Sequence, residues 1–263
     1  MRRLFTFFAV AILAMGAAAA NAGVILDQET TANVQTGAAS NKRTIMIEGN
    51  KQKVIDGRHT VITDLDRGLM IMIDPASKTY MEMPFPPTGR LAAMMQGSGS
   101  FKINFKKTDK QKTVSGYKCL EYIGSGHMAM GDYTVTGCFS TSAPGAADYT
   151  AFDKAIEGKL KGTPMETGGE RPEGVPLTLD STTKINPAAI PGLPPEQAKE
   201  MANQPPHTTK TRATSIKAAT LPASTFAVPA GYTKRELPAI PEHMGAPAGG
   251  AHGEPESSTK VPE

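Results

Sequence analysis

Hydrophobic and polar positions alternate along most of the chain in short runs that Gly, Asn, Asp and Pro interrupt. The clearest alternation covers 101–106, where Phe and Ile positions exchange with Lys and Asn positions. A two-residue period is typical of an antiparallel strand with one face in water. We therefore expect strands at Val24–Thr31, Arg43–Glu48, Lys51–Ile55, Thr60–Asp64, Leu69–Asp74, Thr79–Met83, Phe101–Val114, Tyr117–Ile123, Tyr133–Ser140, Val175–Lys184 and Thr208–Ala218.

A helical period is clearest at 149–160. The apolar residues that share one face there are Tyr149, Phe152, Ile156 and Leu160. Shorter helical turns are expected at Leu91–Gln96 and at Glu196–Ala202. The predicted fold class is therefore mainly β with one or two helices.

The N-terminus has the order of a signal peptide. Arg2 and Arg3 precede an apolar stretch, Leu4–Ala20, and small residues up to Ala22 form an AxA-type cleavage site. The apolar stretch gives way to Ala and Gly before it reaches the roughly 20 apolar residues of a membrane span. We expect cleavage near Ala22, export to the periplasm or beyond, and no membrane-spanning segment in the mature protein.

The composition favours one large β domain with unstructured appendages over two small domains. The chain has 26 Gly, 21 Pro and no Trp, and 6% of its residues are aromatic. The expected organisation is a signal peptide at 1–22, an antiparallel β domain at 23–235 and a disordered Pro/Gly-rich tail at 236–263.

The charge balance gives no indication of a polyanionic partner. With Arg2 and Arg3 removed, 26 of the 28 basic residues remain against 25 acidic ones, a net charge of about +1. No attraction to anionic lipid stands out at that charge, and nucleic acid is not an expected partner.

Cys119 and Cys138 are the two cysteines of the chain. In an exported protein such a pair most simply forms a disulfide, the alternative being two free thiols. If Cys119 lies opposite Cys138, the centre of the hairpin falls between Met128 and Ala129, inside a Gly-rich connection at Gly124–Gly131. We expect a structural cross-strand disulfide, because the CxxC spacing of a catalytic pair is absent.

The strand Leu69–Asp74 is apolar on both faces, with Leu and Ile on one and Met on the other. An antiparallel sheet needs only one dry face, so a helix, another sheet or a ligand must cover the second. Helix 149–160 is the obvious cover for one face. Flexible Met side chains suit varied apolar ligands, but they also fill cores. The predicted ligand-binding face consists of Met70, Met72, Met81 and Met83.

A second candidate site is the loop that carries His127, Met128 and Met130. Imidazole and thioether ligands suit Cu(I), so this loop is a weaker alternative as a metal site. Met side chains can equally dock the tip of a hairpin onto a core.

Catalysis is not expected. The chain has no GxSxG, HExxH or Walker-type motif. His59, His127 and His207 are the histidines of the predicted folded part. The expected protein is therefore not an enzyme and has no cofactor.

Three short motifs occur in a fixed order between about Val24 and Tyr232. They consist of Asp74, Pro75, Lys78 and Tyr80; then Gly116, Tyr117 and Cys119; then Phe226, Val228, Pro229, Gly231 and Tyr232. This order resembles a family of exported bacterial domains of unknown function, marked by GYxC and FxVPxGY.

That family is similar in architecture to the half-barrel of periplasmic lipoprotein carriers, in which a curved antiparallel sheet wraps helices. The resemblance implies a protein that binds a lipid or the acyl chain of a lipoprotein. The alternative is a structural or envelope-interaction protein without a small ligand, whose Pro-rich tail contacts protein partners.

Overall fold

The computed structural model describes residues 23–236 except 35–36, 58, 90–101, 129–130, 164–165, 167 and 191. The predicted signal peptide, the expected turns at Leu91–Gln96 and residues 237–263 of the predicted tail lie outside the described residues.

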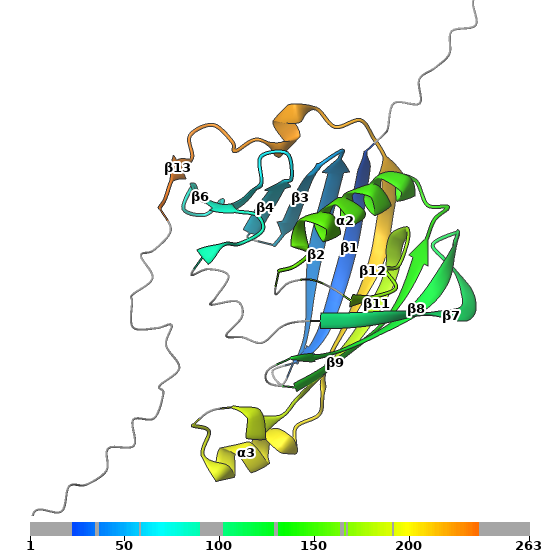
Figure 1. Ribbon diagram of the computed structural model, residues 1–263, viewed down its shortest axis with the longest axis vertical. Coiled ribbons are helices and arrows are strands. Elements are labelled where there is room, and N and C mark those ends of the chain that lie inside the picture. The colour runs from blue at the N-terminus through cyan, green and yellow to red at the C-terminus, as the bar shows by residue number, and fades with distance from the viewer. Residues whose placement is uncertain are drawn as a thin grey trace, which may run out of the picture.

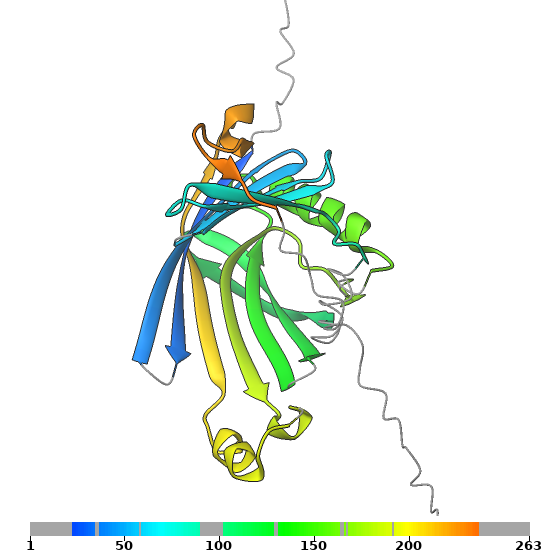
Figure 2. The ribbon, with the colours of Figure 1, turned by 90° about the vertical axis from the view of Figure 1, so that its left-hand side faces the viewer.

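The strands of the described residues form one open, curved sheet (Figures 1 and 2). They are β1 (Val24–Val34), β2 (Gly37–Glu48), β3 (Lys51–Asp56), β4 (His59–Asp64), β5 (Leu69–Asp74), β6 (Thr79–Pro84), β7 (Lys102–Val114), β8 (Tyr117–Met128), β9 (Gly131–Ser140), β10 (Gly168–Gly169), β11 (Val175–Ile185), β12 (His207–Ala218) and β13 (Thr233–Lys234). Their order is β10-β7-β8-β9-β11-β12-β1-β2-β3-β4-β5-β6-β13. The predicted fold class, mainly β with a curved antiparallel sheet, is confirmed.

The sheet consists of two meanders joined along one seam. Strands β1 to β6 are neighbours in sequence order, and so are β7, β8, β9, β11 and β12. The seam is the antiparallel pair β1–β12, in which Thr30 lies opposite Thr211. Only the two-residue strands β10 and β13 run parallel to their neighbours, at the two edges of the described sheet. Elements from both ends of the domain therefore meet at the centre of the sheet.

Helix α2 (Ala146–Leu160) crosses the inner face of the curve (Figure 1). It begins three residues before the expected start, and Phe152 and Leu160 are buried as the apolar periodicity predicted. Helix α3 (Pro195–Ala202) matches the expected turn at Glu196–Ala202 and has no buried residue. Two 3-10 helices, η1 (Pro187–Ala189) and η2 (Ala223–Phe226), complete the described helical elements.

The main core lies between α2 and the sheet. Phe152 packs there with residues of β1, β2 and β11, which are Val24, Leu26, Ile45, Ile47, Val175 and Leu177. Gly145 begins the helix in a left-handed conformation, and a Cβ on it would lie 2.5 Å from the Cβ of Val24. The helix therefore starts in direct contact with β1.

The expected Gly-rich connection at Gly124–Gly131 is wrong, because β8 continues to Met128 and β9 begins at Gly131. A Cβ on Gly124 would lie 2.7 to 2.9 Å from the side chains of Val135, Phe105 and Ile103. This glycine is thus a strand residue that makes room for large neighbours.

Candidate apolar binding groove

The four methionines of the predicted binding face form two cross-strand pairs. In the antiparallel pairing of β5 with β6, Met70 lies opposite Met83 and Met72 lies opposite Met81. Residues that are directly opposite share one face of a sheet, and so do residues two apart on one strand. The structure therefore brings all four side chains to one face of the β5–β6 hairpin.

This face continues across the sheet as an unbroken apolar row. The pairings place Met72 opposite Val61, Val61 opposite Val54, Val54 opposite Ile45, and Ile45 opposite Leu26. Leu26 and Ile45 are buried in the core under α2, Val54 and Val61 are half-buried, and Met72 is 37% exposed. The side chains of this row are therefore buried at β1 and β2 and become more exposed toward β6.

The opening follows from the position of the helix. Helix α2 packs mainly against β1, β2 and β11, so it covers the central strands of the sheet. Val54 and Met70 still pack against the edge of this core. Strands β4, β5 and β6 lie farther along the sheet than the strands on which α2 mainly packs.

Two hollows lie along the open part of the row. One has a volume of about 540 Å³ and is lined by Asn41, Val54, Asp56, Gly57, His59 and Val61. The other has a volume of about 210 Å³, and its lining includes Met72, Met81 and Arg235. Both hollows share His59 and Val61. We call the continuous surface of Val54, Val61, Met72 and Met81 the apolar groove.

The rim of the apolar groove is polar. Asp56 lies opposite His59 in the β3–β4 pairing, and its carboxylate accepts a hydrogen bond from the Asn41 side chain. The pKa of Asp74 is held below its ordinary value, first by a hydrogen bond from the Ser77 hydroxyl and then by the backbone N–H groups of Ser77 and Ala76. The Asp74 carboxylate is thus engaged by its own turn.

The second apolar face of β5 is covered by a segment that lies far away in the sequence. Ile71 and Ile73, together with Ile62 of β4, form a small core with Phe226. Leu221, Val228 and Tyr232 pack around it. The expected helix cover thus serves only the Met face, and the C-terminal segment after β12 covers the Ile face. The alternation of Phe226, Val228 and Tyr232 was the available signal.

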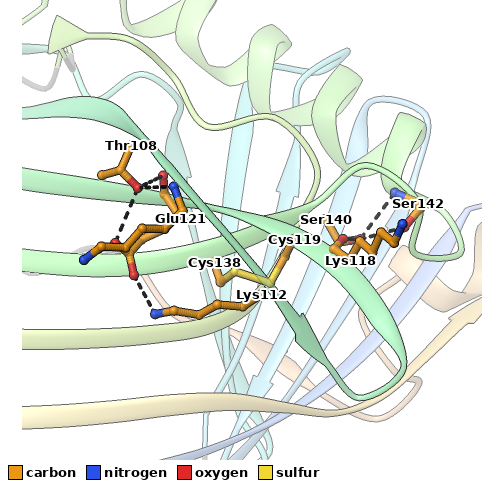
Figure 3. The surroundings of a disulfide bond; sticks show 9 residues. Thr108, Lys112, Lys118, Cys119, Glu121, Cys138, Ser140 and Ser142 are labelled. Carbon is orange, nitrogen blue, oxygen red and sulfur yellow. Dashed lines mark hydrogen bonds and ion pairs between the residues drawn. A yellow bond between two sulfur atoms is a disulfide. The ribbon is translucent and has the colours of Figure 1, made fainter.

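The predicted disulfide between Cys119 and Cys138 is present, with a Cα–Cα distance of 5.4 Å (Figure 3). The expected register is wrong by two residues. Glu121 lies opposite Cys138, so the disulfide runs diagonally between β8 and β9. The expected register was wrong because β8 extends through the glycines as far as Met128 and β9 begins at Gly131.

A buried carboxylate lies next to the disulfide. The Glu121 side chain is 4% exposed, and its Oε2 lies 2.5 Å from Nζ of Lys112 (Figure 3). The hydrogen bond from Lys112 lowers the pKa of Glu121, against the effect of burial, with a further contribution from Lys110. This pair is an intramolecular contact between β7 and β8.

The alternative metal loop stays a prediction. Nδ1 of His127 lies 2.5 Å from Oδ1 of Asp132, and the His127 side chain is 90% exposed. The side chains of Met128 and Met130 lie outside the described residues. Within the described part, no group of three or more His, Cys, Asp or Glu side chains could hold a metal ion.

Residues 25–149 match the model of a domain of unknown function, DUF4412. This agrees with the expected resemblance to a family of unknown function. No curated protein matches the chain. Among the helices of the described residues, none is long and apolar enough to cross a membrane.

Several solved structures are similar to this chain at low identity. PNGF-II is 8% identical, with a TM-score of 0.40, and the match covers 82% of this chain but only 31% of PNGF-II. A LolA superfamily protein from Nitrosomonas europaea is 6% identical, with 79% and 90% of the two chains covered and a TM-score of 0.30. A DUF1329 family protein from Desulfovibrio piger is 7% identical, with 78% and 90% covered and a TM-score of 0.32.

Proposed function

We propose that this chain is an exported protein that binds an apolar ligand, such as the acyl chain of a lipid or a lipoprotein, without catalysing a reaction on it. The observation that carries the proposal is the row from Leu26 to Met81, which begins as closed core and ends as an open apolar groove. Apolar side chains are more stable when they are removed from water, and a bound acyl chain would remove the groove side chains from water.

The shape of the groove supports an elongated ligand. Val54, Val61, Met72 and Met81 lie on four successive strands, so the groove spans three strand spacings, or about 14 Å at the usual spacing of about 4.8 Å. Two of its four side chains are Met, which adapts to ligands of varied shape. Each methylene group removed from water contributes about 0.8 kcal/mol to binding.

Export is part of the proposal for two reasons. The disulfide between Cys119 and Cys138 suits an oxidising compartment. The order of charged, apolar and small residues before Gly23 is that of a signal peptide. Periplasmic delivery would place the groove where acyl chains are available.

The test is a fluorescence titration of the purified protein with an environment-sensitive apolar dye, followed by displacement with a fatty acid. We expect dye binding to be lost in Met72→Asp and retained in Met72→Leu. Ile123→Asp is the matched control, because Ile123 is 45% exposed and lies on β8, far from the groove in strand order. Equal dye binding by wild type, Met72→Asp and Ile123→Asp would contradict the proposal.

Native mass spectrometry of protein recovered from the periplasm provides a second test. We expect co-purified species that lipid extraction identifies as acyl compounds, and we expect them to be absent from Met72→Asp. A clean mass of the free chain, together with no gain in dye fluorescence, would exclude the ligand-binding function.

A further inference from the structure

The hairpin of β7 and β8 carries a local excess of positive charge that is larger than the net charge of the whole chain. The segment 102–118 contains one acidic residue, Asp109, and six lysines, which are Lys102, Lys106, Lys107, Lys110, Lys112 and Lys118. Its net charge is therefore +5, whereas the whole chain has a net charge of +3. The rest of the chain is thus slightly acidic. We call 102–118 the lysine hairpin.

Most of this charge is open to solvent. Lys106, Lys107 and Lys118 are exposed, and none of them forms an ion pair with another described residue. Lys110 and Lys112 pair with the buried Glu121, but their side chains are still 73% and 52% exposed. Two further carboxylates lie near Lys107, because Glu170 accepts a hydrogen bond from its backbone N–H and Glu173 interacts with it electrostatically. The carboxylates of Asp109, Glu121, Glu170 and Glu173 therefore offset part, but not all, of the charge of the six lysines.

The lysines surround the hairpin instead of forming one face. Lys106 and Lys107 are consecutive residues of a strand, so they lie on opposite faces. Lys106 lies opposite Ile123, which at 45% exposure is the most exposed large apolar side chain of the described residues. Lys side chains are flexible point charges that impose no fixed geometry on an anion. This arrangement fits a fluid layer of anions better than a shaped acidic surface.

We infer that the lysine hairpin docks the protein onto an anionic phospholipid surface. Exposed lysines near such a surface each contribute about 1 kcal/mol, which corresponds to about fivefold in affinity per lysine. Lys stems can extend along the interface while Ile123 contacts the region between headgroups. The hairpin belongs to the β10–β7–β8 side of the sheet and the apolar groove to the β3–β6 side (Figure 1). Docking would therefore leave the groove accessible, and this inference does not depend on the groove binding a ligand.

Protection of a sheet edge is the ordinary explanation for lysines on β7. It accounts for Lys106 and Lys107, because β7 pairs with β10 over only two residues. It does not account for Lys118 on the interior strand β8 or for the exposed Ile123. The two explanations differ in whether anionic vesicles bind.

The test is flotation of the full-length exported protein with phosphatidylcholine vesicles that contain either no phosphatidylglycerol or about one third of it. We expect binding only to the anionic vesicles, with a steep decrease when salt screens the charges. The triple variant Lys106→Gln, Lys107→Gln, Lys118→Gln should bind about 100-fold more weakly, from about fivefold per lysine. The matched control, Lys42→Gln, Lys210→Gln, Lys217→Gln, removes the same charge from exposed positions elsewhere and should retain binding.

Each other result would overturn the inference. Wild-type protein that binds neutral and anionic vesicles equally, or neither, has no anionic docking surface. Equal loss in both triple variants would assign the effect to overall charge. A lysine hairpin variant that aggregates but binds vesicles as wild type does would assign the lysines to edge protection. Retention on immobilised poly-glutamate without vesicle binding would indicate an acidic protein partner. Circular dichroism of each variant establishes that the fold is retained.

Discussion

Met70 and Met72 lie two positions apart on the same face of β5, yet Met70 packs against the core and Met72 is 37% exposed. The difference arises along the strand, because the two side chains belong to different cross-strand rows. Met70 lies opposite Thr63 and packs against the core edge, whereas Met72 lies opposite Val61, in the row that lines the apolar groove. One methionine therefore contributes to stability and the other is available to a ligand.

Replacing these two residues by Ala should separate the two roles. We expect Met70→Ala to lower the free energy of unfolding by about 1 to 2 kcal/mol, because it removes partly buried apolar volume. Met72→Ala should change it by less than about 0.5 kcal/mol, as is usual for exposed positions. Urea denaturation followed by circular dichroism measures both values. Equal effects of the two substitutions would contradict the assignment of Met72 to an open surface.

Reduction of the disulfide should destabilise the protein strongly. The bond closes a loop with a sequence separation of 19, for which the chain-entropy model predicts about 3 kcal/mol. We expect the urea midpoint to fall when a reductant is added, and the Cys119→Ser, Cys138→Ser double variant to reproduce the lower midpoint. Because the chain has two cysteines, the double variant should not respond to the reductant. An unchanged midpoint on reduction would show that the bond is not structural.

Glu121 should make the stability depend on pH in the acidic range. Its folded pKa lies below the ordinary value of 4.5, so its contribution is complete above that value and disappears as the pH falls through the folded pKa. We therefore expect Glu121→Gln to be less stable than wild type at pH 7 and to approach the wild type as the pH falls below the folded pKa of Glu121. Thermal unfolding across this range measures the difference. A pH-independent difference would contradict the Lys112–Glu121 pair.

Two glycines with opposite surroundings should respond oppositely to Ala. Gly124→Ala places a Cβ within 2.9 Å of three side chains, so we expect a loss of about 1 to 3 kcal/mol from overpacking. Gly158 lies in α2 with no atom within 4 Å of a built Cβ, so Gly158→Ala should stabilise the protein by about 0.5 to 1 kcal/mol. Urea denaturation decides both signs, and stabilisation by Gly124→Ala would show that β8 does not pass through this glycine as a strand.

The sequence predicted elements better than it predicted their boundaries. Local alternation and helical periodicity are properties of neighbouring residues, so they located α2, α3 and the main strands. Glycines in β8 were interpreted as a connection because their strand role depends on Phe105 and Val135, which lie on other strands. The two-residue strands β10 and β13 carry no periodic pattern and depend wholly on the neighbours they meet.

Two of the four predicted methionines, Met72 and Met81, belong to the apolar groove. The two-residue spacing correctly placed Met70, Met72, Met81 and Met83 together, since the β5–β6 turn fixes their register. It could not show that α2 packs mainly on β1, β2 and β11, or that Val54 and Val61 continue the surface. It also missed that Phe226 covers the opposite face, because 153 positions of sequence separate Ile73 from Phe226.

The seam between β1 and β12 determines when this protein can fold. The hydroxyl groups of Thr30 and Thr211 are 2.9 Å apart in space and 181 positions apart in sequence. A chain that enters a compartment from its N-terminus can form the β1–β6 meander early, but the seam has no partner strand until β12 has followed. Non-local pairings of this kind fold slowly, so the sheet closes only after nearly all of the domain has been delivered. During the export that we propose, the edge of β1 at the seam would therefore stay unpaired until β12 has arrived.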